Sequence, residues 1–174
     1  MKLYHTSDVI IKDPSITRGR KNADFGQGFY LSSDLEFSRR WAVKDSLINE
    51  YELDENGLEI IRLSRNADWF EKIMKNRRLE DTLPADIVIG PIANDTLFDT
   101  LGIIGSGFLS SDEALSLLMI GPEYTQVVIK TQKALDQLVW QRAFDAGQDE
   151  ELLETIRKER EQYQIDFSEA MKKM

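Results

Sequence analysis

The chain of 174 residues has no cysteine and only one histidine, His5. The lack of cysteine excludes a disulfide framework, a thiolate nucleophile and a cysteine-ligated zinc site. A single histidine restricts any hydrolytic triad or histidine-rich metal site to His5, and we expect no bound metal. No run approaches the roughly 20 apolar residues of a membrane span, and the first residues lack the apolar segment of a signal peptide. We therefore expect a cytoplasmic protein without membrane contact.

The net charge of −9 is distributed unevenly along the chain. Residues 1–44 carry eight basic and five acidic side chains, so the acidic excess lies in the remainder. A basic segment on an acidic body favours a local anion site over an extended nucleic-acid surface. The alternative is ordinary solvated surface charge.

The chain length fits a single domain with a sizeable core. Predicted helices and strands are mixed without a regular βαβ alternation, which favours an α+β fold. We expect a domain over residues 1–146 and a helical extension over 147–174 that packs on it. Strands are predicted at 3–6, 29–31, 86–91 and 126–130, with a hairpin at 51–63. Helices are predicted from 33 to 42 and at 69–79, 95–104, 111–120, 132–140 and 149 onward.

Familiar nucleotide-binding motifs are absent from the sequence. Gly26-Gln27-Gly28 has no third glycine and leads into a strand, which excludes the dinucleotide fingerprint of doubly wound folds. A phosphate loop with Gly-Lys-Ser/Thr is also absent. Taken alone, His5 reads as a core histidine, and Phe37 and Trp41 at helical spacing read as core aromatics.

Three segments in a fixed order change this interpretation. They are His5-Thr6-Ser7, then Phe25-Gly26-Gln27-Gly28-Phe29-Tyr30-Leu31, then a helical segment with Ser38 and Trp41. This order resembles the NAD+-binding half of the ADP-ribosyltransferase superfamily, in the His-Tyr-Glu branch of diphtheria toxin and the poly(ADP-ribose) polymerases. The similarity extends through Tyr51–Asp54 and Asp86–Asp95 in a group of small, mostly uncharacterised bacterial proteins of this superfamily. The resemblance implies a split β-sheet with flanking helices.

The resemblance also implies a binding site for NAD+ as a substrate. His5 matches the histidine that donates a hydrogen bond to the adenine-side ribose. Thr6 replaces a glycine whose main-chain N–H and C=O hold the nicotinamide carboxamide, and Ser38 matches a serine that adds a third bond. Tyr30 and Trp41 match the aromatic residues that pack against the nicotinamide ring.

Two further NAD+-binding residues are expected from the same comparison. Ser7 completes the match to the His-Gly-Ser segment of the superfamily. Arg18 lies in the connection between the first two strands with Arg20 and Lys21, near the expected path of the diphosphate. The sequence does not decide which of these three cations contacts a phosphate, and a solvated loop is the alternative.

Gln126 departs from the pattern, because it stands where the superfamily has a catalytic glutamate. That glutamate accepts a hydrogen bond from the nicotinamide-ribose 2′-OH and stabilises the oxocarbenium-like transition state. A neutral amide oxygen can accept the same bond at about 0.5–1.5 kcal/mol, against about 1.5–3 kcal/mol for a carboxylate. The difference corresponds to about one to two powers of ten in rate. The catalytic set implied is therefore His5, Tyr30 and Gln126, with reduced turnover.

The resemblance implies a mono-ADP-ribosyltransferase that modifies a protein or nucleic-acid acceptor. Small members of the superfamily are often toxins of toxin–antitoxin or phage-defence systems, so a cognate antitoxin is an expected partner. One alternative is an NAD+ or ADP-ribose sensor that lost turnover with its glutamate. Another is an interaction protein whose C-terminal helix docks a partner.

Overall fold

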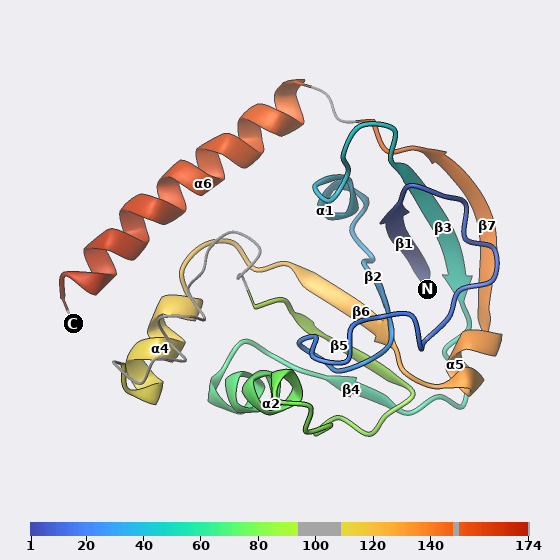
Figure 1. Cartoon of the computed structure of the whole chain (residues 1–174), viewed down its shortest axis with the longest axis horizontal. Coiled ribbons are helices and arrows are strands. Elements are labelled where there is room, and N and C mark those ends of the chain that lie inside the picture. The colour runs from blue at the N-terminus through green and yellow to red at the C-terminus, as the bar shows by residue number, and fades with distance from the viewer. Residues whose placement is uncertain (94–108, 148–149, 174) are drawn as a thin grey trace.

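A computed structural model describes residues 1–93, 109–147 and 150–173 (Figure 1). The strands are β1 (Lys2–Ser7), β2 (Phe29–Leu31), β3 (Leu47–Leu53), β4 (Ile60–Arg62), β5 (Ile87–Pro91), β6 (Thr125–Ile129) and β7 (Leu138–Asp145). The helices are α1 (Leu35–Arg39), α2 (Ala67–Arg77), α4 (Ser111–Leu118), α5 (Gln132–Asp136) and α6 (Glu150–Met171). The mixture of sheets and helices is an α+β architecture, as the sequence predicts.

The strands form two sheets that contact at one edge. The first is antiparallel with the order β1-β3-β7, and the second has the order β2-β6-β5-β4, in which β4 and β5 are parallel. A single bridge joins β1 to the end of β2: Tyr4 N–H donates to the Ser32 carbonyl at 2.8 Å, and Ser32 N–H donates back at 3.0 Å. Beyond this bridge the strands diverge.

Two hydrophobic clusters cover opposite faces of the second sheet. Val127 and Ile129 of β6 pack with side chains of the first sheet such as Leu3 and Tyr51, and so hold the two sheets together. Val128, on the other face of β6, packs under α2 and α4. The alternation along β6 places Gln126 on the same face as Val128, beside the α2 cluster.

The turn before β2 depends on two glycines. Gly26 has a φ of +79°, which favours glycine. A Cβ on Gly28 would lie 2.6 Å from both the Ile129 carbonyl oxygen and a Val128 methyl. Gly28 therefore lets this turn lie directly against β6.

Helix α6 runs along one side of the molecule, past α1 and toward α4 (Figure 1). Its Glu159 accepts two hydrogen bonds from the Arg40 guanidinium, at 2.7 and 2.6 Å, and one from the Tyr124 hydroxyl at 2.8 Å. Tyr163 of the same helix is buried. These contacts attach the extension to the body, while the domain division at residue 146 stays a prediction. Among the described residues, no helix combines the length and apolarity needed to cross a bilayer.

Three predicted elements are wrong. The hairpin at 51–63 does not form, because β3 pairs with β1 and β7 whereas β4 pairs with β5 in the other sheet. The helix at 132–140 ends at Asp136, and the chain continues as β7. The first predicted helix ends at Arg39, so Trp41 lies in the turn that follows. The helix predicted at 95–104 falls outside the described residues.

Candidate functional site

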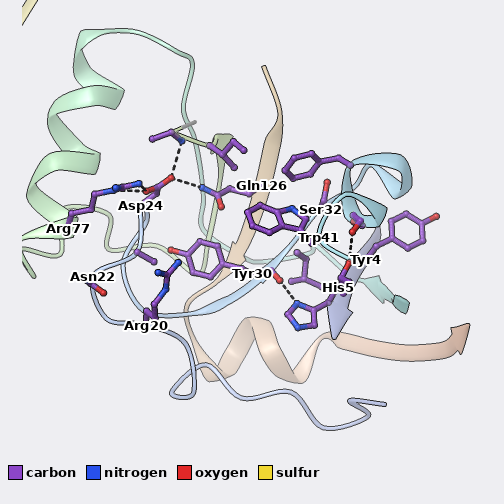
Figure 2. Close-up of a pocket in the computed structure, with 17 residues that line it drawn as sticks. Tyr4, His5, Arg20, Asn22, Asp24, Tyr30, Ser32, Trp41, Arg77 and Gln126 are labelled. Carbon is purple, nitrogen blue, oxygen red and sulfur yellow. Dashed lines mark hydrogen bonds and ion pairs between the residues drawn. The ribbon is translucent and has the colours of Figure 1, made fainter. Parts of the chain in front are cut away.

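A pocket of about 680 Å³ opens where the two sheets diverge (Figure 2). Its walls come from β1, the loop before β2, the end of β2, α1 and the turn after it. The end of α2, the residues after β5 and the start of β6 complete the lining. Six of the eight residues expected from the sequence line it: His5, Thr6, Tyr30, Ser38, Trp41 and Gln126. The volume lies within the usual range for a small-molecule site, about 300–1,000 Å³.

The main chain of Thr6 faces this pocket. In an antiparallel pair, residues alternate between those that exchange main-chain hydrogen bonds with the partner strand and those that point away from it. Met1 exchanges such bonds with Leu53, while Tyr4 directs its N–H and C=O to Ser32. The same alternation turns the N–H and C=O of Thr6 away from β3, on the pocket side. Its hydroxyl donates to the Ser38 carbonyl at 2.5 Å and so joins β1 to α1.

His5 is held in one tautomer. Its Nδ1 lies 2.7 Å from the Tyr30 carbonyl oxygen, which can only accept, so Nδ1 carries the proton. Burial lowers the pKa of His5, and the bond to Tyr30 opposes this shift. The neutral ring then has Nε2 as a hydrogen-bond acceptor. A ligand hydroxyl that reaches this nitrogen would therefore donate to His5, whereas the resemblance implies a donating histidine.

Tyr30 stabilises the wall of the pocket next to the glycine turn. Its hydroxyl donates to the Gly26 carbonyl at 2.7 Å and accepts from Phe25 N–H at 3.1 Å. Burial raises the pKa of the Tyr30 phenol, so the group stays protonated. With its hydroxyl engaged in the turn, Tyr30 offers the ring rather than the hydroxyl to a ligand.

The opposite wall is aromatic. Trp41 is 49% exposed at the rim, and its ring meets Phe37 edge to face at 6.0 Å between centroids. Phe37 stacks in turn on Tyr124 at 4.6 Å. Ser38 is buried, and its hydroxyl donates to the Asp34 carbonyl at 2.9 Å. The hydroxyl can therefore only accept a hydrogen bond from a ligand.

Gln126 lies in the floor of the pocket beside a buried carboxylate. Its Nε2 is 3.5 Å from Oδ2 of Asp24. The same oxygen accepts from Ala93 N–H at 3.0 Å, and Oδ1 accepts from Arg77 Nε at 2.8 Å. Figure 2 shows the Gln126 oxygen on the side away from Asp24, toward the space between Tyr30 and Trp41.

Two expected residues lie outside the pocket lining. The Ser7 hydroxyl bonds the Val9 carbonyl and accepts from the Asn49 side chain at 3.1 Å. Arg18 is exposed in the loop, whereas Arg20 of the same loop lines the pocket. Arg20 is therefore the better placed of the loop's basic residues to meet an anion bound there.

Several lining residues were not predicted as site residues. Asp24 stands directly before the Phe25-Gly26 motif, so its position next to the motif was the available signal. Arg77 and Ala93 are more than fifty residues distant in sequence, and only the fold brings them to Asp24. Across the parts of the chain that the structure describes, acidic and histidine side chains form no group of three that could hold a metal ion.

Comparison with known proteins identifies a family. The family model described as "Protein of unknown function (DUF3990)" matches residues 1–140. This span includes every residue that lines the pocket, and it ends before α6. No curated protein matches the chain. Because the match covers most of the sequence, the chain belongs to the DUF3990 family.

Proposed function

We propose that the pocket binds NAD+ and that the protein is a mono-ADP-ribosyltransferase. The observation that carries the proposal is the main chain of Thr6, whose N–H and C=O both face the pocket. A primary carboxamide presents one acceptor oxygen and an NH2 donor, so it complements this pair of groups. Tyr30 and Trp41 flank the same space, and aromatic faces attract a cationic ring such as nicotinamide in NAD+.

Polar groups around the pocket suit the rest of the dinucleotide. The Nε2 acceptor of His5 suits a ribose hydroxyl, and the Gln126 oxygen suits a hydroxyl of the nicotinamide ribose. Arg20 provides positive charge for the diphosphate, in place of the predicted Arg18. The same residues accommodate a ligand with a carboxamide, two ribose groups and an anionic linker.

The proposed reaction is a substitution at C1′ of the nicotinamide ribose. The bond from C1′ to the nicotinamide nitrogen breaks, and nicotinamide leaves with the electron pair. A nucleophile on the acceptor forms a new bond to C1′ and loses its proton to solvent. The role of Thr6, Tyr30 and Trp41 is to hold the leaving group, and that of Gln126 is to accept from the 2′-OH as positive charge develops on the ribose.

A second candidate function rests on the neutral amide of Gln126. An amide cannot act as a base toward the incoming nucleophile. The carboxylate beside Gln126, Asp24, is already bonded to Arg77 and Ala93. A protein that binds NAD+ or ADP-ribose without turnover, as a sensor, is consistent with this arrangement.

Direct binding and product analysis separate the two functions. We would measure NAD+ affinity by calorimetry and nicotinamide release by chromatography for the wild type, His5→Ala and Gln126→Ala. Trp140→Phe, outside the pocket on β7, is the control. A transferase binds NAD+ and releases nicotinamide, with release reduced in both pocket variants. Binding without release supports the sensor, and absence of binding refutes both functions.

The acceptor is identified by label transfer. NAD+ labelled in the adenylate is incubated with the protein and a bacterial lysate, and the product is treated with protease or nuclease. Loss of macromolecular label on protease treatment indicates a protein acceptor, and loss on nuclease treatment indicates a nucleic acid. Growth arrest on expression, absent in His5→Ala, would support a toxin that requires an antitoxin.

A further inference from the structure

A buried ionic group lies immediately behind Gln126. The Asp24 side chain is 11% exposed, and its Oδ1 is bound by both Nε and Nη2 of Arg77 from α2. Its Oδ2 accepts from Ala93 N–H and faces Gln126 Nε2 at 3.5 Å. One carboxylate therefore connects α2, the end of β5 and the start of β6 at the pocket floor.

This contact determines how the Gln126 amide is oriented. A carboxylate oxygen can only accept a hydrogen bond, so the amide nitrogen must face Asp24. The reverse orientation would place the amide oxygen against a negative oxygen at the same distance. At 3.5 Å the hydrogen bond is weak, and the electrostatic preference for the nitrogen sets the orientation. The Gln126 oxygen is thereby directed into the pocket, as in Figure 2.

We propose that Asp24 is a positioning residue that holds the Gln126 amide with its oxygen toward the ligand, and that this pair admits only one negative charge. The part that concerns the ligand rests on the proposed NAD+ function, whereas the charge limit is a property of the pair itself. The surroundings of position 126 therefore favour a neutral glutamine over an ionised glutamate. Glutamate there does not restore a more active enzyme at neutral pH.

The charges around the pair explain this limit. Arg77 faces Asp24 from α2, and Arg20, in the loop before β2, lines the same pocket. The Tyr30 phenol on β2 stays protonated, and His5 on β1 is neutral. A second carboxylate at position 126 would lie about as far from Asp24 as Gln126 does now and would share Arg77 with it. Two buried carboxylates this close hold a proton between them, which raises the pKa of one of them.

The first test measures thermal stability against pH. In Gln126→Glu, the folded state binds a proton that the unfolded state releases above about pH 4.3. Its Tm therefore falls relative to the wild type as pH rises from 5 to 8, and the penalty is complete above the raised pKa. A rise of two pKa units corresponds to about 5–10 °C for a chain of this size. The Asp24–Arg77 contact is intact in this variant, so we expect it to fold.

The reciprocal exchange, Asp24→Asn with Gln126→Glu, keeps one carboxylate and one amide in the pair. We expect its Tm difference from the wild type to be independent of pH between 5 and 8. Asn76→Ala is the control, because it removes a 3.0 Å bond to the Asp24 carbonyl without touching the carboxylate. It lowers Tm by the same amount at every pH. A Gln126→Glu deficit that does not change with pH overturns the proposal.

NAD+ binding measured at the same pH values tests the positioning role. Relative to the wild type at each pH, Gln126→Glu is expected to bind within a few-fold at pH 5.5 and at least ten-fold more weakly at pH 8. Equal relative affinity at both pH values overturns the positioning role even if the stability result holds. If the wild type binds no NAD+, the proposed function fails, and the stability measurement still decides the charge limit.

Discussion

His5 shows how one hydrogen bond can set the chemistry of a side chain. The Tyr30 carbonyl accepts from Nδ1, and burial disfavours the charged ring. The second ring nitrogen is thereby an acceptor at neutral pH. His5 is also the only histidine of the chain, so a histidine titration can be assigned to it without ambiguity.

We predict that stability depends on pH through His5. Because burial lowers the folded-state pKa of His5 below 6.5, the unfolded chain binds more protons just below that value. Stability is therefore unaffected above about pH 6.5 and falls as pH decreases toward the folded-state pKa. Urea unfolding between pH 5 and 8 measures the effect. His5→Gln should remove the slope, and a slope retained in this variant would assign it to carboxylates.

Trp41 tests the aromatic wall of the pocket. Because it is 49% exposed, its loss should change stability little, whereas stacking and cation–π contacts contribute about 1–2 kcal/mol to binding. We predict that Trp41→Ala weakens NAD+ binding by about ten-fold in calorimetry, with a nearly unchanged Tm. Val43→Ala is the control, since Val43 is 71% exposed in the same turn and does not line the pocket. Equal affinities for the two variants would count against a ring bound at Trp41.

Single residues were predictable where a local motif identified them. His5, Tyr30 and Gln126 were placed by their order along the chain, and all three line the pocket. Asp24 was missed as a site residue because its role depends on Arg77, which is remote in sequence. Arg18 was preferred to Arg20 because a sequence does not show which side of a loop faces the body.

At the scale of elements, the turn before β2 places Tyr30 by close packing. Gly28 lies against the β6 main chain, where no side chain fits. The second glycine of the Phe-Gly-x-Gly pattern is therefore a packing requirement.

We predict that Gly28→Ala lowers the free energy of unfolding by about 1–3 kcal/mol, because β2 or β6 must shift. Gly57→Ala is the comparison: its Cβ would meet nothing within 4 Å, and only its φ of +72° is unfavourable, at about 1 kcal/mol. Guanidinium unfolding of both variants measures the difference. A Gly28→Ala cost no larger than that of Gly57→Ala would show that the turn moves freely.

Elements were predictable where the signal was local. The helix predicted from residue 111 begins there as α4, and Ser110 and Glu113 form a capping box at its start. The residues 54–57 do form a turn, closed by a hydrogen bond from Leu58 N–H to the Glu55 carbonyl at 3.2 Å, but a turn does not specify which strands its arms pair with. β3 and β4 therefore joined different sheets. β7 was missed because the helix that begins after Thr131 was predicted to continue to residue 140. In the structure it ends at Asp136.

At the scale of the whole molecule, α6 is connected to the pocket through side chains. Glu159 binds Arg40 and Tyr124, and Tyr124 stacks on Phe37 of the pocket wall. The Arg40 hydrogen bonds lower the pKa of Glu159. The stability that these hydrogen bonds give to the folded chain is therefore present at neutral pH, and it is lost as pH falls below about 4.5.

We predict that Glu159→Gln lowers the free energy of unfolding by about 1–2 kcal/mol at pH 7, and that this cost shrinks as pH falls below about 4.5 toward the lowered pKa of Glu159. Hydrogen exchange of α6 and α1 should increase. Glu154→Gln is the matched control on the same helix. Glu154 pairs only at the exposed surface with Arg157 and Lys158, so its loss should change the stability little. Equal exchange in the two variants would show that Glu159 does not fasten α6.

At position 6 the pocket is formed by main-chain groups, which do not depend on which side chain stands there. Any side chain that leaves β1 intact preserves the N–H and C=O there, so a search for a particular residue type at this position would overlook the site. A one-residue slip of β1 against β3 would instead exchange bonded and outward-facing positions and remove the site without changing a single residue. The direction of these main-chain groups thus depends on strand register, and the register can be read from the amide exchange of one backbone N–H.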